Sequence, residues 1–487
     1  MKRTVVIALC IALAGAVAVT PVEGAEGACP APAPASNKVL WPPRPGPGAF
    51  DVAHFGEAHW NEGQGPKTMP ILVRDIESFD PNLVLFSADI ADTGSKDRLQ
   101  CFRSIMGPIQ AAGIPYFSSP GNHDRLPQVG PGGFFGDIAV WREVFADMPA
   151  PWGDGDVAND DYRLPEEEPD EGEGAATHYY FDYAPAGSPA VRVIVMDNSL
   201  QSFESSDRDQ FPAVGPAQKD VNQLAFLDRV SGDAHAKGLL TFVVMHQPTQ
   251  DPRDISNVHP SSVNHVMGKG ASPDNQAFDL IASRNGVDGV FLGHIQGNAT
   301  YAVEETQYFI DGGGGGSPYA MNSVGTDTGY YYGFRIVRVH EGSTGPGYST
   351  YFVPLIDKID VAAPKKVAVK KKIQLSAVAT QPFDPDLPPR LSGVENAAIE
   401  LQLRQPDPGR SDYEHLPKLA YMWKVSDPKI LRPIADRDND PVDETGFDPK
   451  TMTTSGRFRA LRSGVVTVTI MSGTHKRSVR IRVTPSR

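Results

Sequence analysis

Ser119-Pro120-Gly121-Asn122-His123-Asp124-Arg125 follows directly on the apolar run Ile114-Pro115-Tyr116-Phe117. The run is short, rich in β-formers and bounded by Pro and Gly, so it predicts a buried strand. The polar residues would then emerge together at its carboxyl end, where buried parallel sheets place their ligands. An amide, an imidazole and a carboxylate in succession predict a site that binds a metal and contacts its substrate. Alone, the same residues also fit an ordinary polar turn, in which Asn and Asp bond their own backbone.

The segments on either side of this stretch predict a βαβαβ arrangement with a parallel sheet. Strands are expected at 50–55 and 82–89, and helices at 69–79 and 99–112. Further strands are expected at 177–183, 190–196, 240–246, 290–296, 300–303, 307–311, 332–339 and 351–355, and helices at 136–148 and 220–230. The pattern is typical of an α/β domain whose parallel strands end at one edge.

Ligand-type side chains recur at five separate strand ends, which carry Glu57/His59, Asp89, Asn122/His123, His246 and His294/Gln296. A single histidine is more often structural, but ligand types at five strand ends need a common purpose. A dinuclear metal site provides one, because a carboxylate such as Asp89 bridges two cations about 3.5–4 Å apart, and both cations stabilise an in-line displacement at phosphorus.

With these blocks in view, the chain resembles the calcineurin-like metallophosphoesterase superfamily over roughly Val39 to Leu355. That family carries Asp-x-His, Gly-Asp-x-x-Asp, Gly-Asn-His-Asp/Glu, a lone His and Gly-His-x-His. Here the blocks read, in the same order, Glu57-Ala58-His59, Ala88-Asp89-Ile90-Ala91-Asp92, Gly121-Asn122-His123-Asp124, His246 and Gly293-His294-Ile295-Gln296. The resemblance implies a four-layer α/β/β/α sandwich with metals at the strand ends.

The resemblance also implies a ligand set for two divalent ions. Asp89, Asn122, His246 and His294 match one metal's ligands, each with the family's residue type. The other ion would take Glu57, His59, the shared Asp89 and Gln296, where Glu replaces the usual Asp and Gln replaces the usual His. This altered site is expected to bind loosely or to prefer a harder ion such as Mn²⁺ or Mg²⁺. Mn, Fe, Zn and Mg all stay open, and His54 and Gln64 stay open as competing ligands.

Catalytic roles follow from the same resemblance. The two ions would lower the pKa of a shared water, and the resulting hydroxide would attack the phosphate ester in line. His123 resembles the residue that contacts the phosphoryl oxygens and protonates the leaving group, with Asp124 orienting it. For Asp124 the alternative is a turn-capping carboxylate. Arg125 is expected to contact substrate or to pair with an acid, and the run Gly312–Gly316 is expected to be a permissive turn that passes close to the metals.

The N-terminus predicts export. Lys2-Arg3 precedes the apolar run Val5 to Val19 and then small residues, so residues 1–28 are expected to be a secretory signal peptide, with a Pro/Ala-rich leader over 29–48. A retained anchor is the alternative, and no later segment is apolar and long enough to span a bilayer. Cys29 and Cys101 either form a disulfide or remain two unpaired thiols, and the sequence does not decide between these alternatives. The expected location is extracellular or in the cell envelope.

The composition changes after Ile356, and lysines at 365–372 precede strand-like segments without convincing helices. The expected domains are a metallophosphoesterase domain over 49–356 and a second domain over 363–487. The second domain resembles a bacterial immunoglobulin-like β-sandwich of the intimin/invasin type, with Trp423 in its core. The lysines are interpreted as a solvated strand edge, and contact with an anionic cell envelope is the alternative.

Length and charge limit the function classes. The chain has 487 residues, enough for two domains, and its net charge of -14 argues against a general nucleic-acid binder, so no specific nucleic-acid binding is expected. The acidic run Glu166–Glu171 is interpreted as a surface loop, with calcium binding as the alternative. The expected function is a secreted metal-dependent hydrolase of phosphate mono- or diesters. The alternative is a catalytically decayed phosphoesterase fold that serves as an envelope or matrix binding module.

Overall fold

The predicted βαβαβ arrangement is present at the N-terminal end of the described chain. In the computed structural model its elements are β1 (Ala49–Phe55), α1 (Gly65–Phe79), β2 (Leu83–Phe86), α2 (Lys96–Ile105), α3 (Gly107–Ala111) and β3 (Tyr116–Ser118). β1, β2 and β3 pair in parallel. The one helix expected over 99–112 is two helices, because Pro108 has no N–H to continue the hydrogen-bonding pattern of α2. Two antiparallel strands, β11 (Gly333–Gly342) and β12 (Gly345–Pro354), complete a five-stranded sheet in the order β12-β11-β1-β2-β3.

The structure describes residues 29–33, 38–61, 63, 65–125, 138–146, 162–163, 178–199, 223–250, 273–316, 332–342, 345–381, 398–400, 421–434, 448, 450–453 and 455–486. The predicted signal peptide, the acidic run 166–171 and the competing ligand Gln64 lie outside these residues.

A second, seven-stranded sheet has the order β4-β5-β6-β7-β8-β10-β9. Its strands are β4 (Tyr162–Arg163), β5 (Tyr179–Tyr183), β6 (Val191–Val195), β7 (Leu240–Val244), β8 (Gly289–Leu292), β9 (Asn298–Val303) and β10 (Thr306–Asp311). β6, β7, β8 and β10 run parallel, whereas β5 and β9 pair antiparallel at the two sides. Among the described residues, α4 (Ala139–Val144) lies in the connection between the two sheets. α6 (Gln223–Lys237) connects β6 to β7, and α7 (Pro273–Arg284) connects β7 to β8.

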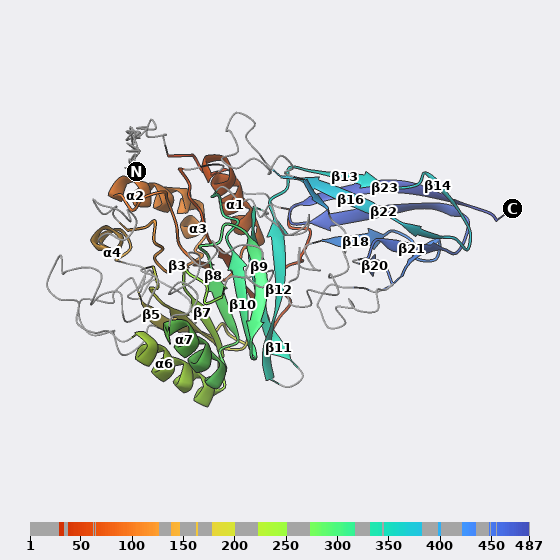
Figure 1. The fold of residues 1–487 in the computed structure, drawn as a ribbon. Helices are drawn as coiled ribbons and strands as arrows, with labels where there is room; N and C mark the ends of the chain where they lie inside the picture. The colour runs from red at the N-terminus through yellow and green to blue at the C-terminus, as the bar shows by residue number, and fades with distance from the viewer. Residues whose placement is uncertain are drawn as a thin grey trace, which may run out of the picture.

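The predicted four layers are confirmed by the cores between them. One core lies between the sheets and includes Val52 and Leu85 from the first sheet and Val193 and Val244 from the second. A second core packs α1, α2 and α3 on the outer face of the five-stranded sheet, and a third packs α6 and α7 on the outer face of the seven-stranded sheet. Figure 1 shows the two helical layers on opposite sides of the sheets. Because the central strands are covered on both faces, they read as continuous apolar runs.

The chain after residue 356 is all-β within the described residues, as the composition predicts. Its strands are β13 (Lys358–Ala362), β14 (Lys366–Ala368), β15 (Lys372–Gln374), β16 (Ser376–Thr380), β17 (Ala398–Glu400), β18 (Met422–Val425), β19 (Leu431–Pro433), β20 (Met452–Thr453), β21 (Arg457–Ala460), β22 (Gly464–Ser472) and β23 (His475–Thr484). They form sheets of order β13-β16-β17, β14-β23-β22-β18-β20 and β15-β21-β19. Trp423 is 1% exposed within their common core. The immunoglobulin-like identity and the exact domain boundaries stay predictions.

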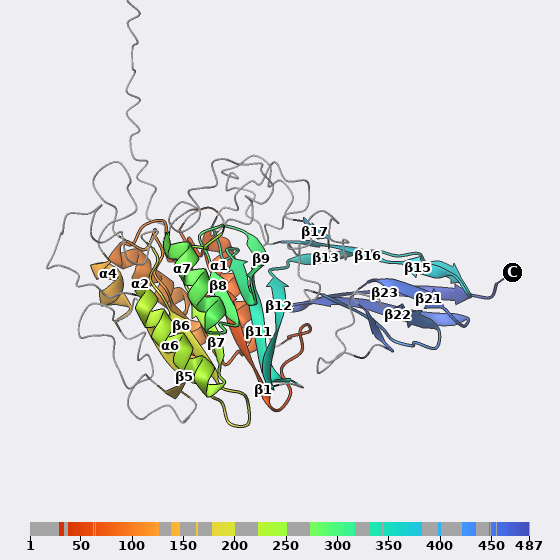
Figure 2. The ribbon, with the colours of Figure 1, turned by 60° about the horizontal axis from the view of Figure 1, so that its bottom comes forward.

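The C-terminal strands pack directly on the α/β layers. Trp41, which precedes β1, pairs with Gly473 in the turn between β22 and β23 and packs edge-on against Tyr351, with ring centroids 6.4 Å apart. Met422 and Met452 belong to the same core as α1 and α2. Figure 2 shows the C-terminal strands projecting from the layers, with the C-terminus at the far end.

Two further features concern the N-terminal segment and the membrane. A disulfide joins Cys29 to Cys101 in α2, which decides between the two alternatives for these cysteines. Within the described residues, none of the helices has the length and apolar character needed to cross a bilayer.

Candidate metal centre

The five strand ends singled out in the sequence meet in one place. The residues follow β1, β2, β3, β7 and β8, and the parallel strands of each sheet point their carboxyl ends to the same edge. All seven predicted ligands are at least nine-tenths buried: Glu57, His59, Asp89, Asn122, His246, His294 and Gln296. The structure therefore brings together every predicted ligand, and the contact between His59 and Gln296 joins residues 237 apart in sequence.

One contact set contains the residues that keep the family's types. His246 Nε2 lies 3.3 Å from Asp89 Oδ2, 2.9 Å from Asn122 Oδ1 and 3.1 Å from His294 Nδ1. The ligand atoms of Asp89, His246 and His294 all lie within 4.8 Å of one another. Oxygen and imidazole nitrogen donors at this spacing are the ligands that a divalent transition metal takes in proteins.

The second contact set surrounds His59. Its Nε2 lies 3.2 Å from Glu57 Oε2, 3.2 Å from Gln296 Nε2 and 3.6 Å from Asp89 Oδ2. The longer glutamate side chain makes an additional contact, because Glu57 Oε1 accepts a hydrogen bond from the backbone N–H of His294. Asp89 Oδ2 thus lies close to both His59 and His246 through a single atom, whereas the Glu57 carboxylate contacts His59 through Oε2 and lies 3.6 Å from His246 Nδ1 through Oε1.

The backbone at these ligands is strained. Glu57, His59, Asp89 and His294 have φ of 58°, 36°, 51° and 65°, and Ala88 beside Asp89 has 73°. Non-glycine residues in the left-handed region cost free energy and concentrate where function requires them. The five lie next to one another in space, so the surrounding loops force these side chains to converge.

Asp124 supports the loop that carries Asp89. Its Oδ2 accepts hydrogen bonds from the backbone N–H groups of Asp89 at 3.0 Å and Gly121 at 2.9 Å, and its Oδ1 accepts one from Ile90 at 2.8 Å. These are the contacts of a loop-capping carboxylate, the alternative to a role in orienting His123. Burial and the nearby Asp89 charge raise the pKa of Asp124 to about 7.

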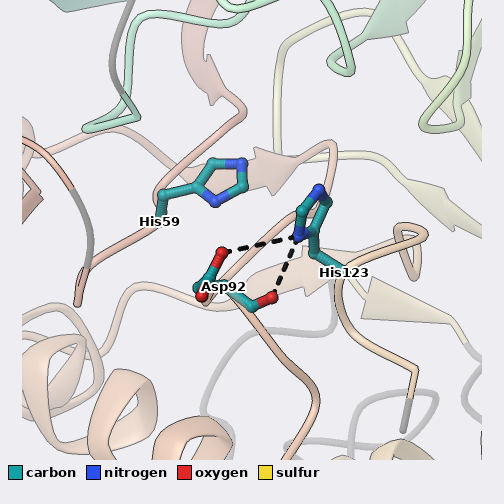
Figure 3. Close-up of side chains that lie close together, drawn as sticks. All are labelled: His59, Asp92 and His123. Carbon is teal, nitrogen blue, oxygen red and sulfur yellow. Dashed lines mark hydrogen bonds and ion pairs between the residues drawn. The ribbon is translucent and has the colours of Figure 1, made fainter. Parts of the chain in front are cut away.

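His123 contacts Asp92 (Figure 3). The Asp92 backbone oxygen accepts a hydrogen bond from His123 Nδ1 at 3.0 Å, and Asp92 Oδ1 lies 4.0 Å from the same nitrogen. The His123 ring stands 4.9 Å from the His59 ring, edge to face. With 19% of its side chain exposed, His123 is the more accessible of the two imidazoles, because the His59 side chain is 1% exposed.

Arg125 pairs with an acid, one of its two expected roles. Its Nη2 lies 3.0 Å from Asp197 Oδ2, and its Nε donates to Ser199 Oγ at 2.7 Å. His54 is placed apart from the ligand set: its Nδ1 lies 2.7 Å from Asp311 Oδ2, and its Nε2 lies 3.1 Å from Ser87 Oγ. Both ring nitrogens are therefore engaged elsewhere.

The glycine run packs against the ligand-bearing loops. Gly314 and Gly316 donate backbone hydrogen bonds to the oxygens of Gly56 and Glu57, each at 2.9 Å. A Cβ on Gly315 would lie 2.1 Å from the Ala58 oxygen, and one on Gly316 would lie 2.9 Å from the His59 ring. The absence of side chains is what allows this approach, as the sequence predicts.

Two residues that support the cluster, Ser87 and Asn198, were not predicted from the sequence. The backbone oxygen of Ser87 accepts a hydrogen bond from His246 Nδ1 at 3.0 Å, which directs Nε2 to the ligand cluster. Asn198 Oδ1 accepts from the backbone N–H groups of His246 at 3.0 Å and Gln247 at 2.9 Å. Neither residue stands in a motif, and a lone serine or asparagine near a strand end gives no sequence signal.

The positive charge of two protonated imidazoles offsets the negative charge of the carboxylates in the cluster. Burial alone would lower the pKa of His246, but the neighbouring Asp89 carboxylate raises it to about 9. His59 is also buried, yet the Asp89 and Glu57 carboxylates raise its pKa well above the usual value. Burial disfavours the Asp89 charge, but His246 and His123 hold its pKa well below the usual range. The pocket therefore favours positive charge, and divalent cations fit it when the imidazoles release their protons.

A sequence model described as calcineurin-like phosphoesterase matches residues 50–297, about half of the chain. The chain belongs to the calcineurin-like phosphoesterase family. The match spans all five ligand-bearing strand ends and stops just after Gln296. No curated protein matches the chain at a significant level.

Solved structures of low identity resemble this calcineurin-like phosphoesterase. The anchor protein GAP50 in the inner membrane complex of Plasmodium is 15% identical, with a TM-score of 0.39, over 63% of this chain and 84% of its own. The purple acid phosphatase PPD1 from yellow lupin is 15% identical, with a TM-score of 0.40, over 61% and 50%. The phosphopantetheinyl hydrolase of Mycobacterium tuberculosis is 12% identical, with a TM-score of 0.30, over 54% and 89%. Since all three scores lie below 0.5, family membership rests on the sequence match.

Proposed function

We propose that the protein is a secreted metal-dependent phosphoesterase that hydrolyses phosphate mono- or diesters with two divalent ions. The observation that carries the proposal is the position of Asp89 Oδ2, 3.3 Å from His246 Nε2 and 3.6 Å from His59 Nε2. A carboxylate oxygen between two imidazole sets is what a bridging ligand requires. Membership of the phosphoesterase family supports the reaction class.

In this proposal Asp89 is shared between the ions. Asn122, His246 and His294 complete one site, and Glu57, His59 and Gln296 complete the other. Bound divalent ions would supply Lewis-acid stabilisation of the phosphoryl oxygens and a water of lowered pKa. The protein's part is positional: Ser87 aims the Nε2 atom of His246, and Asp124 holds the Asp89 loop through three backbone N–H groups.

His123 is proposed to contact the phosphoryl group and to donate a proton to the leaving oxygen. The Asp92 backbone oxygen accepts a hydrogen bond from His123 Nδ1–H and so fixes the ring orientation. The partial exposure of the ring, beside the buried His59, places an acid at the approach to the metal ligands. Asp124 is assigned a supporting role for the loop, because its oxygens are engaged by backbone N–H groups.

The Cys29–Cys101 disulfide supports export. Disulfides persist in oxidising compartments, and this one begins at the first residue after the expected signal peptide. Detection of the mature chain outside the cytoplasm, with its new N-terminus before Cys29, tests the assignment. A full-length protein retained in the cytoplasm with reduced cysteines would contradict it.

The deciding experiment is hydrolysis of an aryl phosphomonoester and an aryl phosphodiester by the purified protein as Mn²⁺ is added, removed with a chelator and restored. We expect turnover of at least one ester that follows the metal. The decayed binding module is favoured by one observation, the replacement of the usual ligands by Glu57 and Gln296. Folded protein that binds Mn²⁺ and hydrolyses neither ester would support that alternative and contradict the enzyme.

A further inference from the structure

The two parts of the chain carry opposite charge. Residues 357–487 contain 23 Lys and Arg against 16 Asp and Glu, a net charge of +7. Residues 1–356 contain 22 against 43, a net charge of -21. The overall net charge of -14 therefore conceals a basic C-terminal region.

The positive charge collects at the end of this region that lies away from the α/β layers, which we call the distal tip. It consists of the turns 369–371, 427–430 and 461–463 and the strand ends beside them. Backbone hydrogen bonds join the turns: Lys370 donates to Ala460 at 2.8 Å, and Leu461 donates to Ile430 at 2.8 Å. The labels of β14 and β21 mark this end in Figure 1, and the label of β15 marks it in Figure 2. β22 runs from the tip to the contact with Trp41, so the tip stands roughly 30 Å from the α/β layers.

The cations of the distal tip are exposed and lack acidic partners among the described residues. They are Lys366, Lys370, Lys371, Lys372, Lys429, Arg432, Arg459, Arg462 and Arg482. Arg459 lies directly opposite Lys372 on one side and Arg432 on the other, a row of like charges that opposes sheet formation. The nearest acid along these turns, Asp427, accepts a hydrogen bond from the Lys429 backbone N–H. An anion bound beside this row would reduce the repulsion between the three side chains.

Two exposed apolar side chains lie among these cations. Leu461 is 38% exposed and Val465 is 47% exposed, and they are two of the four exposed large hydrophobic residues in the described part of the chain. Val465 is the strand partner of Arg482, which in turn is the strand partner of Lys366. Exposed apolar residues beside lysine and arginine are typical of a surface that lies on a bilayer, where the cations meet lipid headgroups.

We propose that the distal tip binds an anionic phospholipid surface. An anionic surface repels the negative net charge of residues 1–356. The bound protein is therefore oriented with the distal tip on the bilayer and the α/β layers, with the candidate metal centre, away from the headgroups. Single-stranded nucleic acid fits the tip less well, because none of the exposed large hydrophobic residues described is an aromatic on which bases could stack. This inference does not depend on the proposed phosphoesterase activity.

The test is co-sedimentation of the purified protein with vesicles of phosphatidylcholine alone or mixed with about one third phosphatidylglycerol. We expect binding only to the mixed vesicles, and weaker binding as salt is raised. Each cation near an anionic bilayer contributes about a fivefold gain, so the double variant Lys370→Glu/Lys371→Glu should bind at least about 25-fold more weakly. The matched control, Lys476→Glu/Arg477→Glu, makes the same charge change at exposed positions near the Trp41 end of β23 and should lose much less. Circular dichroism melting of both variants checks that they are folded.

A second pair of variants tests the apolar contact. Leu461→Ser/Val465→Ser keeps every cation and should reduce the binding that remains at high salt. Equal binding to both vesicle types, or an equal loss in the Lys370/Lys371 and Lys476/Arg477 variants, would overturn the proposal. It would also be overturned if double-stranded DNA at equal phosphate concentration displaced the protein completely and Leu461→Ser/Val465→Ser had no effect, because the tip would then bind soluble polyanions.

Discussion

Gln296→His restores the residue type usual in the family, and it should tighten the weaker of the two proposed metal sites. Gln296 places a neutral amide 3.2 Å from His59 Nε2, whereas an imidazole would add a stronger donor at the same position. Gly316 lies against this side chain, since an added Cβ there would come within 3.0 Å of the Gln296 side-chain carbon, so the ring depends on the absence of a side chain at Gly316. The loss of a residue that merely orients a ligand changes metal affinity by about 10- to 100-fold. A gained ligand should therefore strengthen the second binding step by at least about tenfold, or about 1.4 kcal/mol.

The assay is titration calorimetry with Mn²⁺ beside turnover of an aryl phosphate ester. Wild type should show one tight and one weak step, with activity that saturates only after the weak step. In Gln296→His the weak step should move to lower Mn²⁺ and the activity curve should move with it. Gln110→His, which makes the same substitution on α3 away from the centre, should behave as wild type. Two equal sites in wild type, or an unchanged second step in Gln296→His, would refute the reasoning.

Three further changes have defined outcomes. His123→Ala should slow turnover by about 100-fold or more while metal analysis shows the same ion content, and loss of ions would make His123 a ligand instead. The pKa of His246 is raised to about 9 in the metal-free protein, and an imidazole must be neutral to bind metal. Mn²⁺ affinity should therefore rise from neutral pH to about 9 and then level off, with proton release visible in calorimetry in two buffers. An Mn²⁺ affinity that does not change with pH would contradict the assignment of a proton to His246 in the absence of metal. The Cys29–Cys101 bond closes a separation of 72 residues, so Cys29→Ser/Cys101→Ser should lower the free energy of unfolding by about 4 kcal/mol in urea, and an unchanged midpoint would argue against it.

The layers and the location of the centre were predictable because they depend on local patterns. Apolar runs such as 240–244 identify strands covered on both faces, and parallel strands must end at a common edge. Glu57, Asp89 and His246 stand just past such strands, so their convergence follows from topology. The break between α2 and α3 shows the limit of periodicity, since the apolar spacing continues across Pro108 while the backbone pattern does not.

A capping role for Asp124 within its own turn was one expected alternative, but the supporting contacts between distant segments were not predictable because they are made through backbone atoms. Asp124 reaches the N–H of Asp89 across 35 residues, and Ser87 reaches His246 across 159. A backbone N–H or C=O group is present whatever the residue type, so no motif marks it. The left-handed conformation of Glu57 and Asp89 is likewise imposed by neighbouring loops, since neither residue type favours it strongly enough to signal it.

The central claim is that Asp89 is shared by two ions that act together on a phosphate ester. Asp89→Asn tests it most directly, because the amide keeps the shape of the carboxylate and can still accept the hydrogen bond that the backbone N–H of His123 donates to Asp89 Oδ1 at 2.9 Å. The measurement is metal content per folded chain, taken with ester hydrolysis on the same samples at saturating Mn²⁺. The account predicts two ions and turnover in wild type, and fewer ions with no turnover in a variant of unchanged circular dichroism. Two tightly held ions and wild-type turnover in Asp89→Asn would contradict it.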